Sequence, residues 1–433
     1  MSLPLIGLAC LFPAWLGQDS AVAQEMTAVE ILEHAPERIR QYRTAELVIS
    51  VVDRNGKPVP NARVEIRQMR HEFLFGCNIF GWEQPNDEDR AKYRDQFAAL
   101  LNYATLPFYW RGYEPQPGKP QHASREVVAA WCREHGVTTK GHPLVWNHIA
   151  GTPEWLPDDL DQVVALSNAR VADIVGRGKG QVDIWDVVNE AADPFRAGPD
   201  FAGRMTDAWM HFGKMPLTIE PFKIARQANL QATLLINDYR VDAEYEKVIK
   251  QLVDEQGRRL YDAIGIQSHM HGGAWPTERI WQVCERFARF GVPLHFTETT
   301  IISGPKTPQS WETTPEGEAR QAEEAARFYT VLFSHPAVQA ITWWDFADRH
   351  AWQGAPAGFL RKDLSPKPIY QRLMGLIKGE WWTNAEATTD AAGRCSVRAF
   401  YGDYAIKVVS GESETTVRFH LSKAGDRSTT IAL

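Results

Sequence analysis

Cysteine is scarce in this sequence, with five residues in a chain of 433. No Cys-x-x-Cys pair and no Cys/His spacing of the zinc-binding kind occurs among Cys10, Cys77, Cys132, Cys284 and Cys395. This spacing argues against a dense disulfide framework and a zinc site, and we predict neither a metal ion nor another cofactor. Buried free thiols are the expected state, although export would permit a disulfide.

Excess positive charge is also lacking. Asp and Glu outnumber Lys and Arg by 54 to 47, the formal net charge is −7, and no basic stripe runs along the chain. Nucleic acid is therefore excluded as a partner. No glycine-rich fingerprint follows a candidate strand, which removes the usual sign of a dinucleotide-binding fold.

Long hydrophobic runs are missing beyond the N-terminus, so no membrane span is predicted. Residues 3–16 are apolar, and the Ala-Val-Ala of residues 21–23 offers a small-x-small cleavage site. We therefore predict a signal peptide over residues 1–23 and a secreted or periplasmic protein. The stretch departs from the usual signal in having no positive charge before its apolar run.

The remaining composition is typical of a globular protein, with 44% hydrophobic and 23% charged residues. The length suits a barrel of roughly 250 to 300 residues together with an accessory module. Sixteen tryptophans raise the aromatic content to 11%, which fits a large core and also a cleft that binds sugar rings.

Residues 24–71 form the first predicted segment. Residues 25–42 have apolar side chains near one helical face, which predicts a helix. Two apolar, alternating stretches at 45–52 and 62–67 flank the turn sequence Asp-Arg-Asn-Gly of residues 53–56. This pattern is typical of a β-hairpin, which we assign to an accessory β module.

Residues 72–378 repeat a short apolar strand, a loop and an amphipathic helix. Candidate strands lie at 73–80, 103–110, 138–146, 182–190, 232–239, 263–269, 294–300 and 340–346, and helices such as 125–135, 162–175 and 321–333 separate them. Successive βα units of this kind predict an α/β fold, a closed (β/α)8 TIM barrel. An open doubly wound sheet is the structural alternative.

Residues 379–433 change to short β runs at 395–400, 404–409, 415–421 and 429–433. Because an isolated hairpin is marginal in water, we predict that these strands join the N-terminal strands in one β-sandwich-like module beside the barrel. The alternative is a set of separate small appendages packed on the barrel.

Two barrel strands end in a carboxylate. The strand at 182–190 reads Ile-Trp-Asp-Val-Val-Asn-Glu up to Glu190, and the strand at 294–300 reads Leu-His-Phe-Thr-Glu up to Glu298. A carboxylate at the end of an apolar strand is costly to bury unless the site uses it, and the carboxyl ends of barrel strands carry the active site.

Paired carboxylates are what glycoside cleavage needs, since one protonates the leaving oxygen and the other attacks the anomeric carbon. We assign Glu190 as the acid/base and Glu298 as the nucleophile of a retaining mechanism. Asn189, beside the acid, can bond the sugar 2-hydroxyl. The alternative is a non-catalytic carbohydrate-binding protein on the same barrel, and turnover of an aryl glycoside that is unchanged in Glu298→Gln would show that the assigned mechanism is wrong.

Several linked motifs resemble glycoside hydrolase family 10, the endo-β-1,4-xylanase family. They are Gly-His-Pro-Leu-Val-Trp at 141–146, Trp-Asp-Val-Val-Asn-Glu-Ala at 185–191, Ile-Asn-Asp-Tyr at 236–239, Gly-Ile-Gln-Ser-His at 265–269 and Ile-Thr-Trp-Trp-Asp at 341–345. The resemblance implies a polysaccharide or oligosaccharide substrate and repeats the assignment of Glu190, Glu298 and Asn189. It implies that His269 orients the nucleophile and that His142 binds a sugar hydroxyl. Further substrate-binding or supporting positions implied by it are Trp146, Gln267, Trp344 and Trp352, and Tyr239 is implied as a contact on the leaving-group side.

The chain also departs from this family. Where the family usually carries Glu-Asn and then Lys to grip the second glycone sugar, the sequence has Thr105-Leu106 and Tyr109. Asn-His-Ile follows Trp146, and Thr299-Thr300 replaces a Leu-Asp after the nucleophile. We therefore expect an altered glycone subsite, in which Arg111, Tyr109 and His148 could recognise a different or decorated sugar. An exo-acting or side-chain-specific β-glycosidase on another plant or microbial glycan is the alternative to a xylanase.

Overall fold

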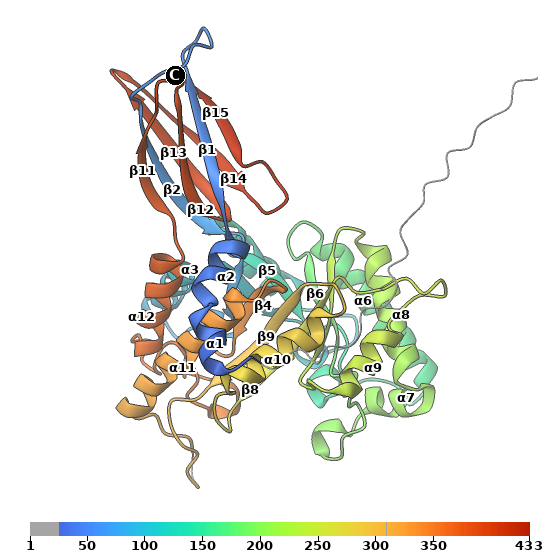
Figure 1. Cartoon of the computed structure of the whole chain (residues 1–433). Coiled ribbons are helices and arrows are strands. Elements are labelled where there is room, and N and C mark those ends of the chain that lie inside the picture. The colour runs from blue at the N-terminus through green and yellow to red at the C-terminus, as the bar shows by residue number, and fades with distance from the viewer. Residues whose placement is uncertain (1–25, 309) are drawn as a thin grey trace, which may run out of the picture.

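The central feature of the molecule is a closed barrel of eight parallel strands, seen in a computed structural model that describes residues 26–308 and 310–433 (Figure 1). The predicted signal peptide lies outside the described residues. The barrel strands are β3 (Leu74–Asn78), β4 (Tyr103–Pro107), β5 (Thr138–His142), β6 (Ile184–Asn189), β7 (Thr233–Asp238), β8 (Ala263–Met270), β9 (Leu294–Ile301) and β10 (Val338–Trp343). β10 pairs with β3 and so closes the circle, which confirms the predicted TIM barrel.

Helices cover the outside of the barrel. They are α3 (Asp87–Leu100), α4 (Trp110–Tyr113), α5 (His122–Glu134), α6 (Leu160–Gly178), α7 (Arg204–Phe212), α8 (Lys214–Ala228), α9 (Ala243–Gln251), α10 (Thr277–Ala288), α11 (Pro315–Ser334) and α12 (Pro368–Gly375). Side-chain caps begin several of them, such as Asp159 at α6 and Asn86 at α3. Helices outside and a packed interior bury the strands on both faces, and every residue of β9 is buried.

The N-terminal segment forms two short helices, α1 (Ala28–Glu33) and α2 (Ala35–Arg43), where one helix was predicted. α1 packs on the barrel against α10 and α11, and α2 packs against α11 and leads into β1. The Arg43 guanidinium secures α2 by donating to the carbonyl oxygens of Phe333, His335 and Val338 at 2.6–2.7 Å. The assignment of this helical segment to the accessory module is therefore corrected.

The accessory module consists of two sheets built from both ends of the chain. One has the order β12-β1-β15 and the other the order β11-β2-β13-β14. The strands are β1 (Thr44–Val52), β2 (Arg63–His71), β11 (Asn384–Thr388), β12 (Arg394–Phe400), β13 (Gly402–Ser410), β14 (Ser413–Leu421) and β15 (Ser428–Ala432). A shared core that includes Leu47, Ile49, Ile66 and Ile406 lies between them.

The predicted hairpin is wrong. β1 pairs with β12 and β15, whereas β2 pairs with β11 and β13, so the two strands belong to opposite sheets. Each strand directs its alternating apolar side chains into the space between the sheets, and the segment after β1 crosses from one sheet to the other. Alternation alone predicts a buried face and does not choose the partner strand.

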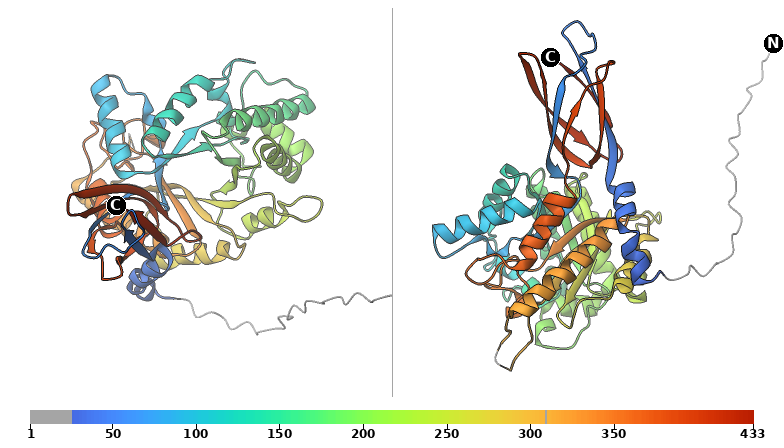
Figure 2. Two further views of the ribbon diagram at one scale, coloured as in Figure 1. Left: turned by 90° about the horizontal axis from the view of Figure 1, so that it is seen from above. Right: turned by 60° about the vertical axis from the view of Figure 1, so that its left-hand side comes forward.

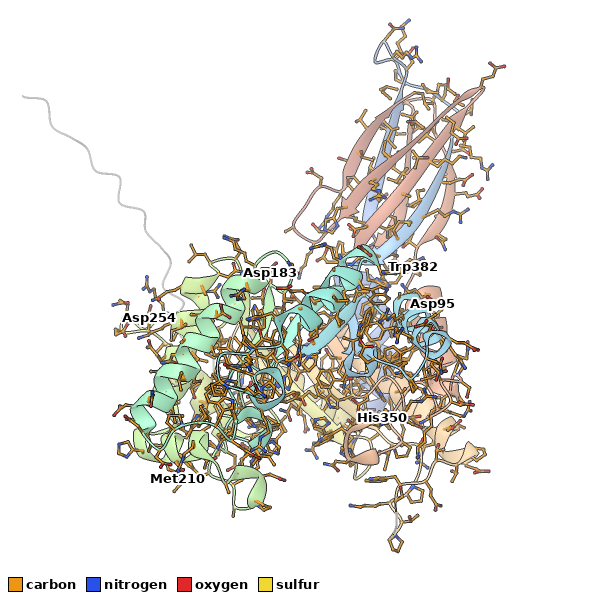
Figure 3. All side chains as sticks on the ribbon, turned by 180° about the vertical axis from the view of Figure 1, so that it is seen from behind. Asp95, Asp183, Met210, Asp254, His350 and Trp382 are labelled. Atoms are coloured by element: carbon orange, nitrogen blue, oxygen red, sulfur yellow. The ribbon has the colours of Figure 1, made fainter. Side chains whose placement is uncertain are left out.

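The module extends from the end of the barrel at which the strands begin. β2 ends at His71 and β3 begins at Leu74, so the chain passes directly from one part to the other. Figure 2 shows the module extending away from the helical ring, and in Figure 3 Asp183, just before β6, lies on the module side while His350 lies on the far side. Trp381 and Trp382 pack at the junction against Phe333 and His71 respectively.

The described residues contain no disulfide bond, no membrane-spanning helix and no metal-binding cluster. Cys77, Cys132, Cys284 and Cys395, the cysteines within residues 26–308 and 310–433, are unpaired. Within the same part of the chain, no helix is long and apolar enough to cross a membrane. Across these same ranges, His, Cys, Asp and Glu side chains form no cluster of three or more that is suited to a metal ion.

Candidate active site

A single cavity of about 700 Å³ at the carboxyl ends of the barrel strands collects the predicted site residues. Parallel strands end at the same mouth of a barrel, so residues far apart in sequence meet there. The cavity is lined by every residue assigned from the sequence as catalytic, substrate-binding or supporting: His142, Trp146, Asn189, Glu190, Tyr239, Gln267, His269, Glu298, Trp344 and Trp352.

Glu190 follows directly after β6 and has an unusual backbone. Its φ is +62°, in the left-handed region that non-glycine residues rarely adopt. Its N–H donates to the Asn237 carbonyl at 2.8 Å, and the Ala192 N–H donates to the Asp238 carboxylate at 2.8 Å. These bonds to the end of β7 hold the turn and place the Glu190 side chain in the cavity. Backbone strain of this kind is common at functional positions.

The Glu190 carboxylate is 7% exposed and is surrounded by donors. Gln267 Nε2 donates to Oε1 at 3.2 Å, and Trp146 Nε1 donates to Oε2 at 3.1 Å. The Arg196 guanidinium also donates to Oε2 and forms an ion pair with it. Two of the three donors were predicted site residues, whereas Arg196 was not.

Glu298, on β9, is 5% exposed and is held from two sides. Asn237 Nδ2 donates to Oε1 at 2.8 Å, and His269 Nε2 lies 3.0 Å from Oε2. Burial acts to raise the pKa of Glu298, but the charge of His142 and the hydrogen bond with His269 outweigh it and hold the pKa below its usual value. Glu298 is therefore kept as a carboxylate at neutral pH.

A buried ion pair lies beneath Glu298. Lys140 Nζ is 2.6 Å from Asp186 Oδ2, and His142 Nδ1 lies 2.8 Å from the same oxygen. His142 Nε2 faces Glu298 Oε1 at 3.7 Å. Burial alone would raise the pKa of Asp186, yet Lys140 and His142 lower it. Lys140 was not predicted from the sequence, because a lysine inside a strand carries no signal of the partner that makes its burial tolerable.

Amide side chains connect the two carboxylates. Gln267 Nε2 donates to Glu190 and also lies 3.2 Å from Asn189 Oδ1, and Asn237 Nδ2 donates both to Asn189 Oδ1 and to Glu298 at 2.8 Å. Because Asn189 Oδ1 accepts two bonds, the orientation of its amide is fixed and Nδ2 remains as a donor for a ligand. Asn237 was quoted in a motif but was assigned no role.

Thr300, two residues after Glu298, stands where the family resemblance implies an aspartate. Thr300 Oγ1 lies 2.9 Å from His269 Nδ1 and donates to the Trp344 carbonyl at 3.0 Å. A hydroxyl therefore lies beside His269 at the position where the resemblance implies a carboxylate. The neighbouring Thr299 hydroxyl bonds Ser268 at 2.8 Å instead of facing the cavity.

Aromatic rings form the walls of the cavity. Trp146 stacks on His148 with ring centres 4.2 Å apart, and the Trp352 ring lies 4.5 Å from His269. Trp344 is buried and Trp352 is 45% exposed, so one ring belongs to the floor and the other to the rim. Flat apolar faces of this kind suit the C–H faces of sugar rings.

Further lining residues were not predicted as site residues. Most of them lie on loops or in short 3-10 turns, and one lies in α10: Phe80, Ala150, Arg196, Phe201, Trp275, Arg279 (in α10), Asp345 and His350. Loop residues have no periodic pattern that would reveal their direction in the sequence. Tyr109 and His148 do line the cavity, as considered from the sequence. Arg111 does not, because its guanidinium donates to the Thr152 carbonyl and pairs with Glu154.

Comparison with known sequences gives a family match over most of the barrel. Residues 68–376 match the sequence profile described as Glycosyl hydrolase family 10. The anti-sigma-I factor RsgI6 of Acetivibrio thermocellus is 27% identical over 421 residues, covering 94% of this chain and 50% of that protein. Endo-1,4-beta-xylanase 1 of Arabidopsis thaliana is 24% identical over 409 residues, covering 89% of this chain and 39% of that protein. The chain thus spans half or less of the length of these relatives.

Solved structures show the same fold. The crystal structure of xylanase 10B from Thermotoga petrophila RKU-1 in complex with xylobiose has a TM-score of 0.59 and 23% identity, covering 71% of this chain and 95% of that chain. Native xylanase 10B from Thermotoga maritima gives the same TM-score and identity, with 71% and 96% of the two chains covered. At this identity the likeness extends to the barrel and its helices.

Proposed function

The chain belongs to glycosyl hydrolase family 10, and from this premise we propose that it is a retaining glycosidase that cleaves β-1,4-xylan-type polysaccharides or oligosaccharides. The observation that carries the proposal is that Glu190, after β6, and Glu298, on β9, line one cavity. They are joined through Gln267, Asn189 and Asn237. Similarity to several endo-1,4-beta-xylanases at low identity supports the substrate class.

The proposed reaction has two displacements. A Glu298 oxygen attacks the anomeric carbon while the glycosidic C–O bond breaks and Glu190 gives its proton to the leaving oxygen. Water then attacks the anomeric carbon, Glu190 takes its proton, and the bond to Glu298 breaks. The lowered pKa of Glu298 supports its role as the attacking carboxylate. Asn189 Nδ2 is placed to donate to the sugar 2-hydroxyl during both steps.

Azide rescue of two truncated variants tests these roles. Glu298→Ala should lower kcat by at least about 10³-fold on an aryl β-glycoside, and azide should restore turnover with the α-glycosyl azide as product. Glu190→Ala should retain the first step on a substrate with an activated leaving group, and azide should give the β-glycosyl azide. Asp95→Asn, exposed on α3, is the control. Equal activity of all three variants would refute the mechanism.

A second candidate, an exo-acting β-glycosidase, is favoured by the aromatic side chains at the altered positions. The Phe80 ring lies 5.0 Å from Trp344 and 6.0 Å from Tyr109, and Tyr109 lies 5.3 Å from His142. Tyr109 occupies the position where the family resemblance implies a lysine that grips the second glycone sugar. A bulky ring there supports a site that accepts one sugar on the glycone side.

The products from short xylo-oligosaccharides distinguish the two candidates. Release of xylose as the first product from xylotetraose, with aryl β-xyloside preferred over aryl β-xylobioside, would establish exo action. Release of xylobiose and longer products would establish endo action. Activity on aryl β-glucosides with none on either xylose substrate would replace the xylan-type substrate by another glycan.

Export of the protein is also proposed. It is supported by the apolar residues 3–16 and the Ala-Val-Ala of residues 21–23. N-terminal sequencing of protein recovered from outside the cytoplasm should begin at Gln24. Recovery of the full-length chain in the cytoplasm alone would contradict the proposal.

A further inference from the structure

Arg196 makes direct contact with the proposed acid/base. It lies in the loop between β6 and α7, lines the cavity, and donates from Nη2 to Glu190 Oε2. Its guanidinium carbon lies 4.1 Å from the centre of the Phe201 ring and 4.9 Å from that of the Tyr239 ring. The side chain is 25% exposed, so a molecule in the cavity can reach it.

This contact obstructs the proton transfer that Glu190 is proposed to perform. Glu190 Oε2 already accepts from Trp146 and Arg196, and Oε1 accepts from Gln267. A carboxyl group that protonates a leaving oxygen must present its O–H to that oxygen. Gln267 is fixed by its position in β8, and the Trp146 ring by its stacking on His148. Arg196, in contrast, lies outside every helix and strand. The donor best able to withdraw when substrate binds is therefore Arg196.

The guanidinium also has an unused donor. Its Nε–H is buried and has no hydrogen-bond acceptor among the described residues. The Nε–H and Nη2–H of arginine form a fork that binds a carboxylate with two parallel hydrogen bonds, and Glu190 uses the Nη2–H side alone. A carboxylate on a ligand that met the withdrawn guanidinium would engage both donors.

The loop that carries Arg196 also holds a second carboxylate, Asp193. Asp193 accepts from the Tyr239 hydroxyl at 2.6 Å and lies 3.9 Å from Arg240 Nη1. Its negative charge is thus partly offset by a partner other than Arg196. The family resemblance places Tyr239 on the leaving-group side of the scissile bond, and the stacking of Arg196 on this ring places the guanidinium on the same side.

We propose that Arg196 recognises a carboxylate on the leaving-group side of the substrate, of the kind carried by a uronic acid branch, and that binding this carboxylate releases Glu190 for proton transfer. The inference rests on the proposed glycosidase function and names a substrate feature for the same site. It makes Arg196 a specificity-determining residue that couples recognition of an acidic glycan to the availability of the acid/base.

A matched pair of substrates tests this proposal: a linear xylo-oligosaccharide, and one of equal backbone length with a glucuronate branch on the leaving-group side. The ratio of kcat/KM, branched over linear, should exceed one in the wild type and fall about tenfold or more in Arg196→Gln, the loss expected for a charge-assisted hydrogen bond. Arg196→Lys should retain part of the preference. Arg204→Gln, which removes a surface arginine of α7 paired with Asp158 and Asp207, should leave the ratio unchanged.

The outcomes separate this inference from the proposed function. A wild type that cleaves the linear substrate without preference, or an Arg196→Gln variant that loses activity equally on both substrates, would overturn the role of Arg196 and leave the glycosidase proposal standing. A wild type that cleaves neither substrate would refute the xylan-type function. Calorimetry tests carboxylate binding by Arg196 independently of turnover. Methyl glucuronide should bind about tenfold more weakly to Arg196→Gln than to wild type, and the binding of methyl glucoside should not change. Equal binding of methyl glucuronide to both proteins would overturn the proposed role of Arg196.

Discussion

The two carboxylates of the cavity have different surroundings at the scale of single residues. Glu298 is held by Asn237 and His269, which belong to barrel strands, and its pKa is lowered mainly by His142. Glu190 stands on a strained turn and shares an oxygen with a loop arginine. A rigid carboxylate suits a nucleophile, and a carboxylate with an exchangeable partner suits a group that gives and takes a proton.

Removing Lys140 should lower both the stability of the protein and its turnover number, because Lys140 pairs with Asp186 beneath Glu298. Lys140→Met leaves the fully buried Asp186 without its lysine, and the free energy of unfolding should fall by about 3–5 kcal/mol, as for a broken buried ion pair. The turnover number should also fall, because His142 loses a fixed partner. Lys223→Met, which breaks a more exposed pair with Glu255, should cost no more than about 1 kcal/mol. Urea unfolding measures both, and equal losses would contradict the account.

Asp238 gives a pH-dependent prediction. Burial raises its pKa to about 7, against bonds from the backbone N–H groups of Arg240 and Ala192 that lower it. A raised pKa means that the folded state holds this proton more tightly than the unfolded state, so Asp238 reduces stability as pH rises from about 4 to about 7.

The variant Asp238→Asn removes this titration. The difference in free energy of unfolding, wild type minus variant, should decrease by about 3 kcal/mol between pH 4.5 and pH 8. The variant also loses a hydrogen bond from a backbone N–H group, and this loss changes the free energy of unfolding by the same amount at every pH. Asp95→Asn on the exposed face of α3 serves as the control. A difference that grows with pH, or one that stays flat, would show that Asp238 is not buried as described.

At the scale of elements, the repeated order of strand, loop and amphipathic helix predicted all the barrel strands, including β5 and β9, which carry several polar residues. β11 escaped prediction, since its sequence Asn-Ala-Glu-Ala-Thr has no large apolar side chain. The hairpin failed for another reason, because pairing between β1 and β12 joins residues some 350 positions apart. The strand-end site residues were predictable, whereas Arg196 depends on a loop conformation that no sequence period encodes.

Close packing between neighbouring strands supplies the element-scale prediction. A Cβ added at Gly141 in β5 would lie 2.1 Å from the Trp185 ring of β6, so Gly141→Ala must displace the strand that carries Lys140 and His142. We expect destabilisation of about 1–3 kcal/mol together with a loss of activity. Gly176→Ala in α6 has open space and should stabilise the protein by about 0.5–1 kcal/mol. Thermal unfolding gives both values, and effects of the same sign would contradict the packing described.

The molecule as a whole has two hydrophobic cores, one in the barrel and one between the sheets of the module. All lining residues of the cavity lie between Phe80 and Trp352, so the module contributes none of them. Its attachment at the opposite end of the barrel strands separates it from the site (Figure 3). Its aromatic residues at the junction pack inward, as the burial of Trp381 and Tyr401 shows.

Matched truncations in the two cores test this separation. Ile406→Ala in the module and Ile266→Ala in β8 each remove a fully buried side chain and should each cost about 2–5 kcal/mol of stability. The module variant should keep kcat/KM within about twofold of wild type, since sites without shared partners act independently. The barrel variant, next to Gln267, should lose activity. An equal loss of kcat/KM in both would show that the module acts on the site.

Trapping of the glycosyl-enzyme tests the central claim most directly. An activated 2-deoxy-2-fluoro β-glycoside of a sugar that the enzyme turns over slows the second displacement, so the covalent intermediate accumulates. Mass spectrometry of the digested protein should find one added glycosyl group, located on Glu298 within the β9 peptide, and Glu298→Gln should remain unlabelled. Turnover without any covalent adduct, or an adduct on another residue such as Glu190, would contradict the account.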